Sequence, residues 1–209
     1  MSLEILPQSG GKAKKLVVLL HGLGSNGEDL LGLVPYIAPE IKDAHFYSPN
    51  GIQKCDMGPF GYQWFSLRER DPDFLIQELD ESSPIVLDMI ENKLNELNLT
   101  FDNLILIGFS QGTMLALYLT AISEFKIKST VGFSGTFLPP REIKNTQTPI
   151  LLVHGANDEV VPYSNLSHSK ARLESAGITK IQTHSIEGLG HSIDLEGLKV
   201  ATKFIKTAY

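Results

Sequence analysis

The sequence predicts an α/β fold, in which a mostly parallel sheet is covered by helices on both faces. Apolar runs at 15–20, 104–107 and 149–154 are typical of strands that are buried on both sides. Helix-forming segments alternate with such runs, which is the pattern of parallel strands joined by crossover helices. At 209 residues the chain suits one domain, residues 1–209, and it shows no linker, repeat or low-complexity segment.

Shorter signals place the other elements. Further strands are expected at 45–48, 129–133 and 180–186, and helices from about 112 to 123, 165 to 175 and 194 to 206. Ser83 and Pro84 predict the start of another helix, because serine is a favoured N-cap and proline is favoured in the first turn. The apolar face of that helix is expected at Leu87, Ile90, Leu94 and Leu97.

The composition argues against several classes of function. The net charge of −6 offers no basic surface for nucleic acid or for an anionic membrane. Cys55, the one cysteine, excludes an internal disulfide and suits a reducing compartment. The N-terminal residues lack the apolar core of a signal peptide, and no apolar run is long enough to span a membrane. We therefore expect a cytoplasmic protein without stable membrane insertion, and the sequence predicts neither a metal site nor a cofactor.

The segment 108–112, Gly-Phe-Ser-Gln-Gly, carries the strongest chemical signal. It lies between a buried strand and a helix-forming segment, so Ser110 would occupy a tight strand-to-helix turn with a glycine two positions away on each side. Such a turn raises the serine hydroxyl above the sheet edge and directs the N–H of the next residue, Gln111, into the same space. We interpret Ser110 as a nucleophile. The similar segment 132–136 has Thr136 in place of the second glycine, and we interpret Ser134 as structural.

A glycine-rich loop, residues 21–27, follows the first predicted strand and has two interpretations. Its glycines match a dinucleotide-binding pattern, in which Gly22, Leu23 and Gly24 would contact a nicotinamide cofactor. That pattern needs an acidic residue at the end of the second strand, and this strand ends in Ser-Pro-Asn at 48–50. The sequence therefore favours the other interpretation, a loop that presents a backbone N–H to a developing oxyanion.

A serine nucleophile needs a base, and the base needs an acid that orients it. Of the six histidines, only His191 lies in a small-residue loop after a strand and before a helix. Asp158 follows the strand at 149–154, and Glu159 is the alternative acid one residue further on. Because the carboxyl ends of parallel strands share one edge, Ser110, Asp158 and His191 are expected to meet there.

The segment 51–73 is rich in glycine, proline and aromatic residues and is predicted to be a long irregular loop. Long loops in compact domains are often functional. This one could wall an acyl pocket, with Trp64 as a candidate lining residue, or it could form a separate apolar cluster.

Taken together, these motifs resemble the phospholipase/carboxylesterase family, which includes acyl-protein thioesterases and lysophospholipases. The resemblance covers nearly the whole chain and is carried by residues 21–24, 108–112, 154–162 and 187–192. It implies an α/β-hydrolase fold without a large lid, a Ser110–His191–Asp158 triad, and oxyanion donors at the N–H groups of Leu23 and Gln111. It also implies an apolar segment beside the acyl channel at Phe137 and Leu138.

The expected function is hydrolysis of an ester or thioester through an acyl-enzyme on Ser110. The substrate would be a small molecule or an acylated protein. Two alternatives remain: an oxidoreductase that uses the loop at 22–24, and a catalytically silent binding module with a hydrolase fold.

Overall fold

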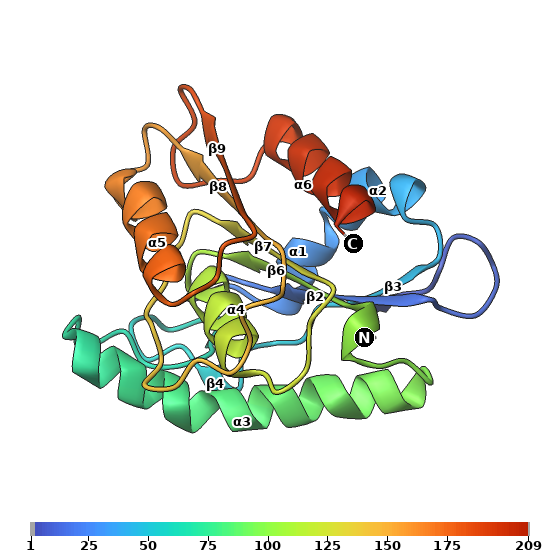
Figure 1. Ribbon diagram of the computed structural model, residues 1–209, viewed down its shortest axis with the longest axis horizontal. Coiled ribbons are helices and arrows are strands. Elements are labelled where there is room, and N and C mark those ends of the chain that lie inside the picture. The colour runs from blue at the N-terminus through green and yellow to red at the C-terminus, as the bar shows by residue number, and fades with distance from the viewer. Residues whose placement is uncertain (1–2, 209) are drawn as a thin grey trace.

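The computed structural model describes residues 3–208, and a seven-stranded sheet runs through its centre (Figure 1). The spatial order is β1 (Glu4–Ile5), β3 (Ala44–Tyr47), β2 (Lys15–Leu20), β6 (Leu104–Phe109), β7 (Ser129–Phe133), β8 (Ile150–Gly155) and β9 (Ile181–Ile186). Every pair in the sheet is parallel except the edge strand β1, which is antiparallel to β3. The predicted, mostly parallel sheet is confirmed.

Helices cover both faces of this sheet, as the buried strands require. Helices α1 (Gly27–Leu31), α2 (Val34–Ile37) and α6 (Leu195–Thr207) lie on one face, and α3 (Pro72–Glu96), α4 (Gln111–Ile122) and α5 (Ser164–Ser175) lie on the other (Figure 1). Alternate residues of β2 face opposite sides of the sheet. Val17 packs in the core under α6, and Val18 packs in the core under α3 and α4. Short 3₁₀ helices, η1 (Ala38–Glu40) and η2 (Phe101–Asn103), precede β3 and β6.

Helix α3 begins at Pro72, about three turns before its predicted start. The prediction that Ser83 and Pro84 open this helix is wrong, because both lie inside it. Asp71 is the N-cap, and its side chain accepts hydrogen bonds from the backbone N–H groups of Asp73 and Phe74, while Pro72 is at the first position. The same cap-and-proline signal therefore occurs twice, and the earlier copy is the helix start.

The long loop predicted at 51–73 contains a small hairpin and the start of α3. Its strands are β4 (Gln53–Lys54) and β5 (Tyr62–Gln63), and they pair antiparallel. The hairpin is joined to the glycine-rich loop by a hydrogen bond from the Gly24 N–H to the Tyr62 carbonyl. This contact holds the two segments together at the carboxyl end of β2.

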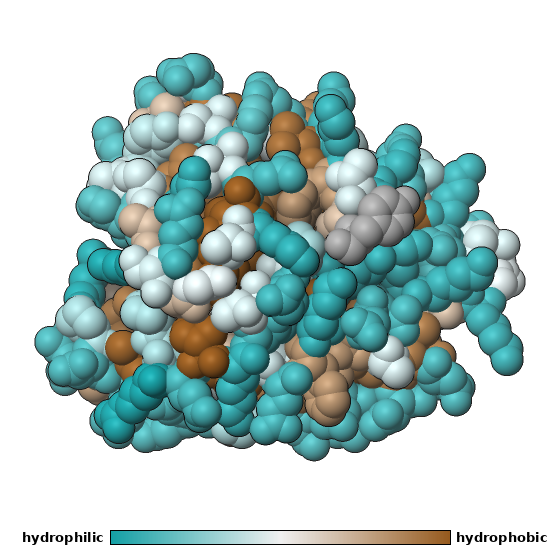
Figure 2. All heavy atoms as spheres, viewed as in Figure 1, coloured by the Kyte–Doolittle hydropathy of each residue, from teal (hydrophilic) through white to brown (hydrophobic). Residues whose placement is uncertain are grey.

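Helix α4 is the most deeply buried helix of the fold. All of its residues from Gln111 to Ala121 are buried, because the helix packs on β6 and β7 beneath α3 and α5. The outer surface is different: the face seen in Figure 2 is mainly hydrophilic, with smaller hydrophobic areas between the polar side chains. The nucleophile candidate therefore lies at the start of a helix that is almost entirely buried.

Candidate active site

Ser110 lies between β6 and α4 in a strained backbone conformation. Its φ of 52° falls in the left-handed region, which non-glycine residues rarely adopt. The turn is tight enough to require glycine at both flanking positions: a Cβ on Gly108 would lie 2.4 Å from the Gly112 carbonyl oxygen, and one on Gly112 would lie 1.9 Å from that of Leu20. The strand-to-helix turn predicted from the sequence is therefore present.

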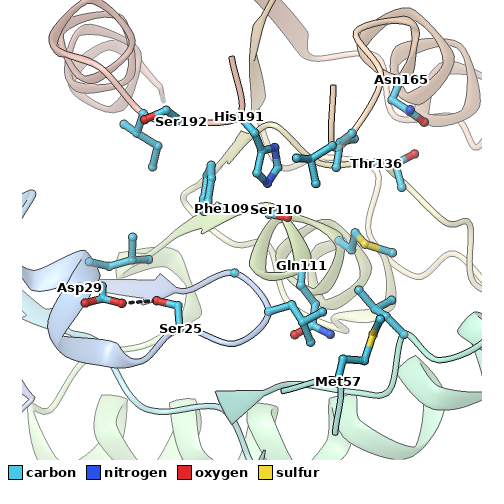
Figure 3. A pocket seen from close by; sticks show the side chains of 18 of the residues that line it. Ser25, Asp29, Met57, Phe109, Ser110, Gln111, Thr136, Asn165, His191 and Ser192 are labelled. Carbon is cyan, nitrogen blue, oxygen red and sulfur yellow. Dashed lines mark hydrogen bonds between the residues drawn. The ribbon is translucent and has the colours of Figure 1, made fainter. Parts of the chain in front are cut away.

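His191 and Asp158 form a hydrogen-bonded pair above this turn. The Nδ1 atom of His191 is 2.8 Å from Oδ2 of Asp158. Because Nδ1–H donates to the carboxylate, Nε2 is the ring atom left free to accept a proton. Figure 3 shows the His191 ring directed toward Ser110, and Phe109 contacts its face at a ring-centroid distance of 4.8 Å. Glu159, the alternative acid, is exposed and has no contact with this histidine.

The Asp158 carboxylate is buried and well supplied with hydrogen-bond donors. Its Oδ1 atom accepts from the backbone N–H groups of Val160 and Val161, both at 2.9 Å. Burial by itself raises the pKa of Asp158, but the hydrogen bonds from His191 and the two backbone groups outweigh burial and lower it below its ordinary value. The carboxylate is therefore held ionised, as a partner for an imidazolium must be.

His154 closes the turn that carries this carboxylate. Its Nε2–H donates to the Val161 carbonyl at 2.9 Å and lies 3.4 Å from Oδ2 of Asp158. The side chain is almost fully buried, and Tyr163 packs against its ring. The sequence indicated only a turn at His154, because nothing local reveals a partner seven residues further on.

The two predicted oxyanion donors lie beside Ser110. Gln111 is the first residue of α4, so no helical carbonyl can accept its backbone N–H. Leu23 lies in the glycine-rich loop, whose shape is fixed by hydrogen bonds of its neighbours, from Ser25 N–H to Gly22 and from Gly24 N–H to Tyr62. Both residues line the same cavity as Ser110 and His191.

A buried layer of polar contacts supports these donors from below. The Gln111 side chain accepts from the Trp64 N–H at 3.0 Å and donates to the Phe65 carbonyl at 2.7 Å. The Trp64 indole donates to the His21 carbonyl at 2.8 Å. Nε2 of His21 accepts from the Gly51 N–H, which leaves Nδ1–H to donate to the Gly22 carbonyl. Burial lowers the pKa of His21, so this ring is a neutral structural link.

A mostly apolar cavity of about 760 Å³ opens around Ser110. This volume is in the range of small-molecule sites. Its apolar wall is made by Leu23, Leu30, Leu33, Met57, Leu67, Leu75, Phe109, Met114, Val160, Val161, Pro162 and Ile193. The segment 51–73 thus contributes to the cavity through Met57, Leu67 and Arg70, while other parts of it are packed into the core.

The structure does not place the three predicted pocket residues, Trp64, Phe137 and Leu138, in this cavity. Trp64 and Phe137 are fully buried, and Leu138 is nearly so, and all three pack within the core clusters. An apolar residue type is compatible with a core position as well as with a pocket wall, and here the core position is the one observed. Ser134, interpreted as structural, is also left-handed, with φ of 48°, and is buried outside the cavity.

The fold and the site define the class: an α/β hydrolase with a serine, a histidine and an aspartate gathered at the carboxyl edge of the sheet. The family model for Phospholipase/Carboxylesterase matches residues 3–209. The chain therefore belongs to the phospholipase/carboxylesterase family and is a carboxylic ester hydrolase. This membership favours an oxyanion loop at 22–24 over a dinucleotide-binding loop.

Individual relatives agree with this placement. The chain is 27% identical to Esterase YpfH of Escherichia coli, over 93% of this chain and 83% of the relative. It is 30% identical to Acyl-protein thioesterase 1 homolog 1 of Dictyostelium discoideum, over 90% and 88% of the two chains. Among solved structures, esterase PE8 superposes with a TM-score of 0.90 at 33% identity, covering 99% of this chain and 97% of the other. SOBER1 of Arabidopsis thaliana has a TM-score of 0.80 at 25% identity, over 93% and 98%.

Between residues 3 and 208, no three His, Cys, Asp or Glu side chains are grouped so that they could hold a metal ion. Across the same residues, no helix combines the length and the apolar composition needed to cross a bilayer.

Proposed function

We propose that the protein hydrolyses esters or thioesters of acyl groups through an acyl-enzyme on Ser110. The observation that carries this proposal is the hydrogen-bonded His191–Asp158 pair, whose histidine lines the same apolar cavity as the strained Ser110. The relatives named as an esterase and as acyl-protein thioesterases support a substrate that is an oxyester or a thioester.

In this mechanism, Ser110 Oγ attacks the acyl carbonyl carbon while Nε2 of His191 takes the hydroxyl proton. The buried carboxylate of Asp158 stabilises the imidazolium that forms. The N–H groups of Leu23 and Gln111 donate to the tetrahedral oxyanion. Histidine then protonates the leaving alcohol or thiol, and a water activated by the same Nε2 hydrolyses the acyl-enzyme.

Replacing Ser110 by alanine tests the nucleophile. Ser110→Ala is expected to abolish hydrolysis of a 4-nitrophenyl ester and labelling by a fluorophosphonate probe, which reacts only with an activated serine. Ser134→Ala is a matched control, because it removes the hydroxyl of the other left-handed serine, outside the cavity. Equal activity of Ser110→Ala and the parent protein would overturn the proposal.

Acyl-chain length is tested with a series of 4-nitrophenyl esters. The apolar cavity is expected to bind successive methylenes, each worth about 0.8 kcal/mol when fully buried. The ratio kcat/KM should therefore rise by up to about fourfold per methylene until the cavity is full. A flat series beyond acetate would show that the acyl group does not bind in the cavity.

A further inference from the structure

The cavity extends to both sides of Ser110, and each side is walled by a different part of the core. Leu30, Leu33, Phe109 and Ile193 belong to the apolar layer under α1, α2 and α6. Leu67, Leu75 and Met114 belong to the layer under α3 and α4. Figure 3 shows Asp29 and Ser25 on one side of Ser110 and Met57 on the other. We name these two halves the α1 arm and the α3 arm.

Each arm contains one charged side chain. Among the described residues that line the cavity, Asp29 is the only aspartate or glutamate and Arg70 the only lysine or arginine. Asp29 lies in α1, next to Leu30, whereas Arg70 lies between Leu67 and Leu75 at the entrance to α3. The cavity therefore has a negative side chain beside the apolar residues of the α1 arm and a positive one in the segment that supplies the α3 arm.

The negative charge of the α1 arm is held in place. Oδ2 of Asp29 accepts hydrogen bonds from Ser25 Oγ at 2.6 Å and from Asn26 Nδ2 at 3.4 Å. Both donors are neutral, so the carboxylate keeps its full charge at the cavity wall. An anionic substituent in this arm would be repelled.

The positive charge of the α3 arm is available to a ligand. The nearby Arg68 is already paired: its Nε lies 3.3 Å from Oδ2 of Asp56, and it donates to the Asp56 carbonyl at 3.0 Å. By contrast, Arg70 forms no ion pair with any residue between 3 and 208, and its exposed side chain lines the cavity. A guanidinium in this setting can bind a carboxylate or phosphate through two parallel hydrogen bonds.

We propose that the α3 arm binds a part of the substrate that ends in an anionic group, with Arg70 as the specificity-determining residue. Asp29 excludes the same group from the α1 arm, so the two charges fix the direction in which a charged ester lies across Ser110. The apolar wall between Ser110 and Arg70 accommodates a short hydrocarbon segment in front of the anion. This inference rests on the proposed esterase function and adds a substrate class to it.

Two pairs of esters test the proposal and identify which half of the substrate carries the anion. The first pair is the mono-4-nitrophenyl ester of adipic acid and its neutral methyl ester, with the charge on the acyl side. The second is 4-hexanoyloxybenzoate and its methyl ester, with the charge on the leaving group. Each is measured with the parent protein, Arg70→Gln, Arg70→Lys and Arg141→Gln, whose arginine is exposed outside the cavity.

In one of the two pairs, Arg70→Gln is expected to lower the anionic-to-neutral ratio of kcat/KM about tenfold, the size of a charge-assisted hydrogen bond. Arg70→Lys should retain most of this ratio and Arg141→Gln all of it. An unchanged ratio in both pairs for Arg70→Gln would overturn the inference while leaving the esterase function intact.

A binding measurement separates the two proposals. Amide analogues of the two anionic esters are titrated calorimetrically into the parent protein and into Arg70→Gln. Absence of hydrolysis of all four esters would contradict the proposed function. Tenfold weaker binding of one amide to Arg70→Gln would still support the anion subsite, and equal binding of both amides would exclude it.

Discussion

Asp158 supplies the negative charge that balances a protonated His191. It is buried, yet its pKa is lowered, because His191 and two backbone N–H groups donate to it. Asp158→Asn should preserve the fold but favour the wrong tautomer of His191. We expect kcat to fall by roughly four orders of magnitude.

The matched control is Glu159→Gln, one residue further along the same turn, whose side chain is exposed. It should leave kcat within about twofold of the parent, as expected for an exposed surface position. Circular dichroism and thermal unfolding would establish that both variants are folded. A large loss of kcat in Glu159→Gln together with a small loss in Asp158→Asn would show that Glu159, and not Asp158, orients His191.

His154 is expected to act as a positioning residue for this carboxylate. His154→Phe removes the hydrogen bond to the Val161 carbonyl, and the turn that carries Asp158 becomes free to shift. A displacement of about 1 Å in such a group can cost about a hundredfold in rate, so kcat should fall with little change in KM. His154→Gln keeps an N–H donor and should recover part of the loss. A purely structural role would lower the melting temperature and leave kcat unchanged.

The positions of the three candidate triad residues could be predicted because each was expected just after a strand. Ser110, Asp158 and His191 each follow a strand, and parallel strands end at one edge. Arg70 and Asp29 could not be found in this way, since charged residues in loops have no spacing that reports which cavity they face. Trp64, expected from its loop, and Phe137, expected from the family resemblance, lie in the core instead of the cavity, because residue type alone does not give the direction of a side chain.

At the scale of elements, the turn between β6 and α4 leaves no room for a side chain at its glycines. A Cβ on Gly112 would lie 1.9 Å from a backbone oxygen of β2, which cannot move without disturbing the centre of the sheet. Gly112→Ala should therefore destabilise the protein by several kcal/mol, on the order of 3–5. Gly11→Ala, whose Cβ would have only a side-chain oxygen 3.9 Å away, should change the free energy of unfolding by less than about 1 kcal/mol. Urea unfolding of both variants measures the contrast.

Helix α3 shows that local sequence signals alone do not determine where a helix begins. Its buried positions continue at helical spacing on both sides of Pro84, from Leu79 to Val86 and Ile90. The cost of an interior proline is offset by packing of this face against α4 and the sheet, an effect that no local sequence signal contains. The edge strand β1 and the short helices α1 and α2 were not predicted either, because each is too short for a periodic pattern.

At the scale of the whole molecule, Glu4 ties the edge strand to a distant helix. Its carboxylate is 2.9 Å from Lys93 Nζ in α3 and 2.8 Å from His45 Nε2 in β3. Burial raises the pKa of Glu4, but the hydrogen bonds from Lys93 and His45 outweigh burial, and the pKa lies below the ordinary value of 4.5. The stabilisation is therefore present above pH 4.5 and is lost as the pH falls through the lowered pKa.

Glu4→Gln is expected to reduce the free energy of unfolding at pH 7 by on the order of 1 kcal/mol. The difference from the parent should shrink at acid pH, where the parent carboxylate is protonated as well. Urea unfolding at a series of pH values measures this, and Glu142→Gln, at an exposed position on another part of the chain, is the control. A difference that stays constant down to pH 3 would contradict the ion-pair explanation.

The complete burial of α4 has a consequence for how such a protein diversifies. A helix enclosed on every side cannot be retuned in small steps, since each new side chain would disturb two apolar layers at once. The loop residues Met57 and Arg70 are exposed at the cavity, and exposed loops tolerate substitution better than a buried helix. Evolved variants of this protein should therefore change their substrate preference through substitutions in those loops, while the position of the Ser110 hydroxyl stays the same.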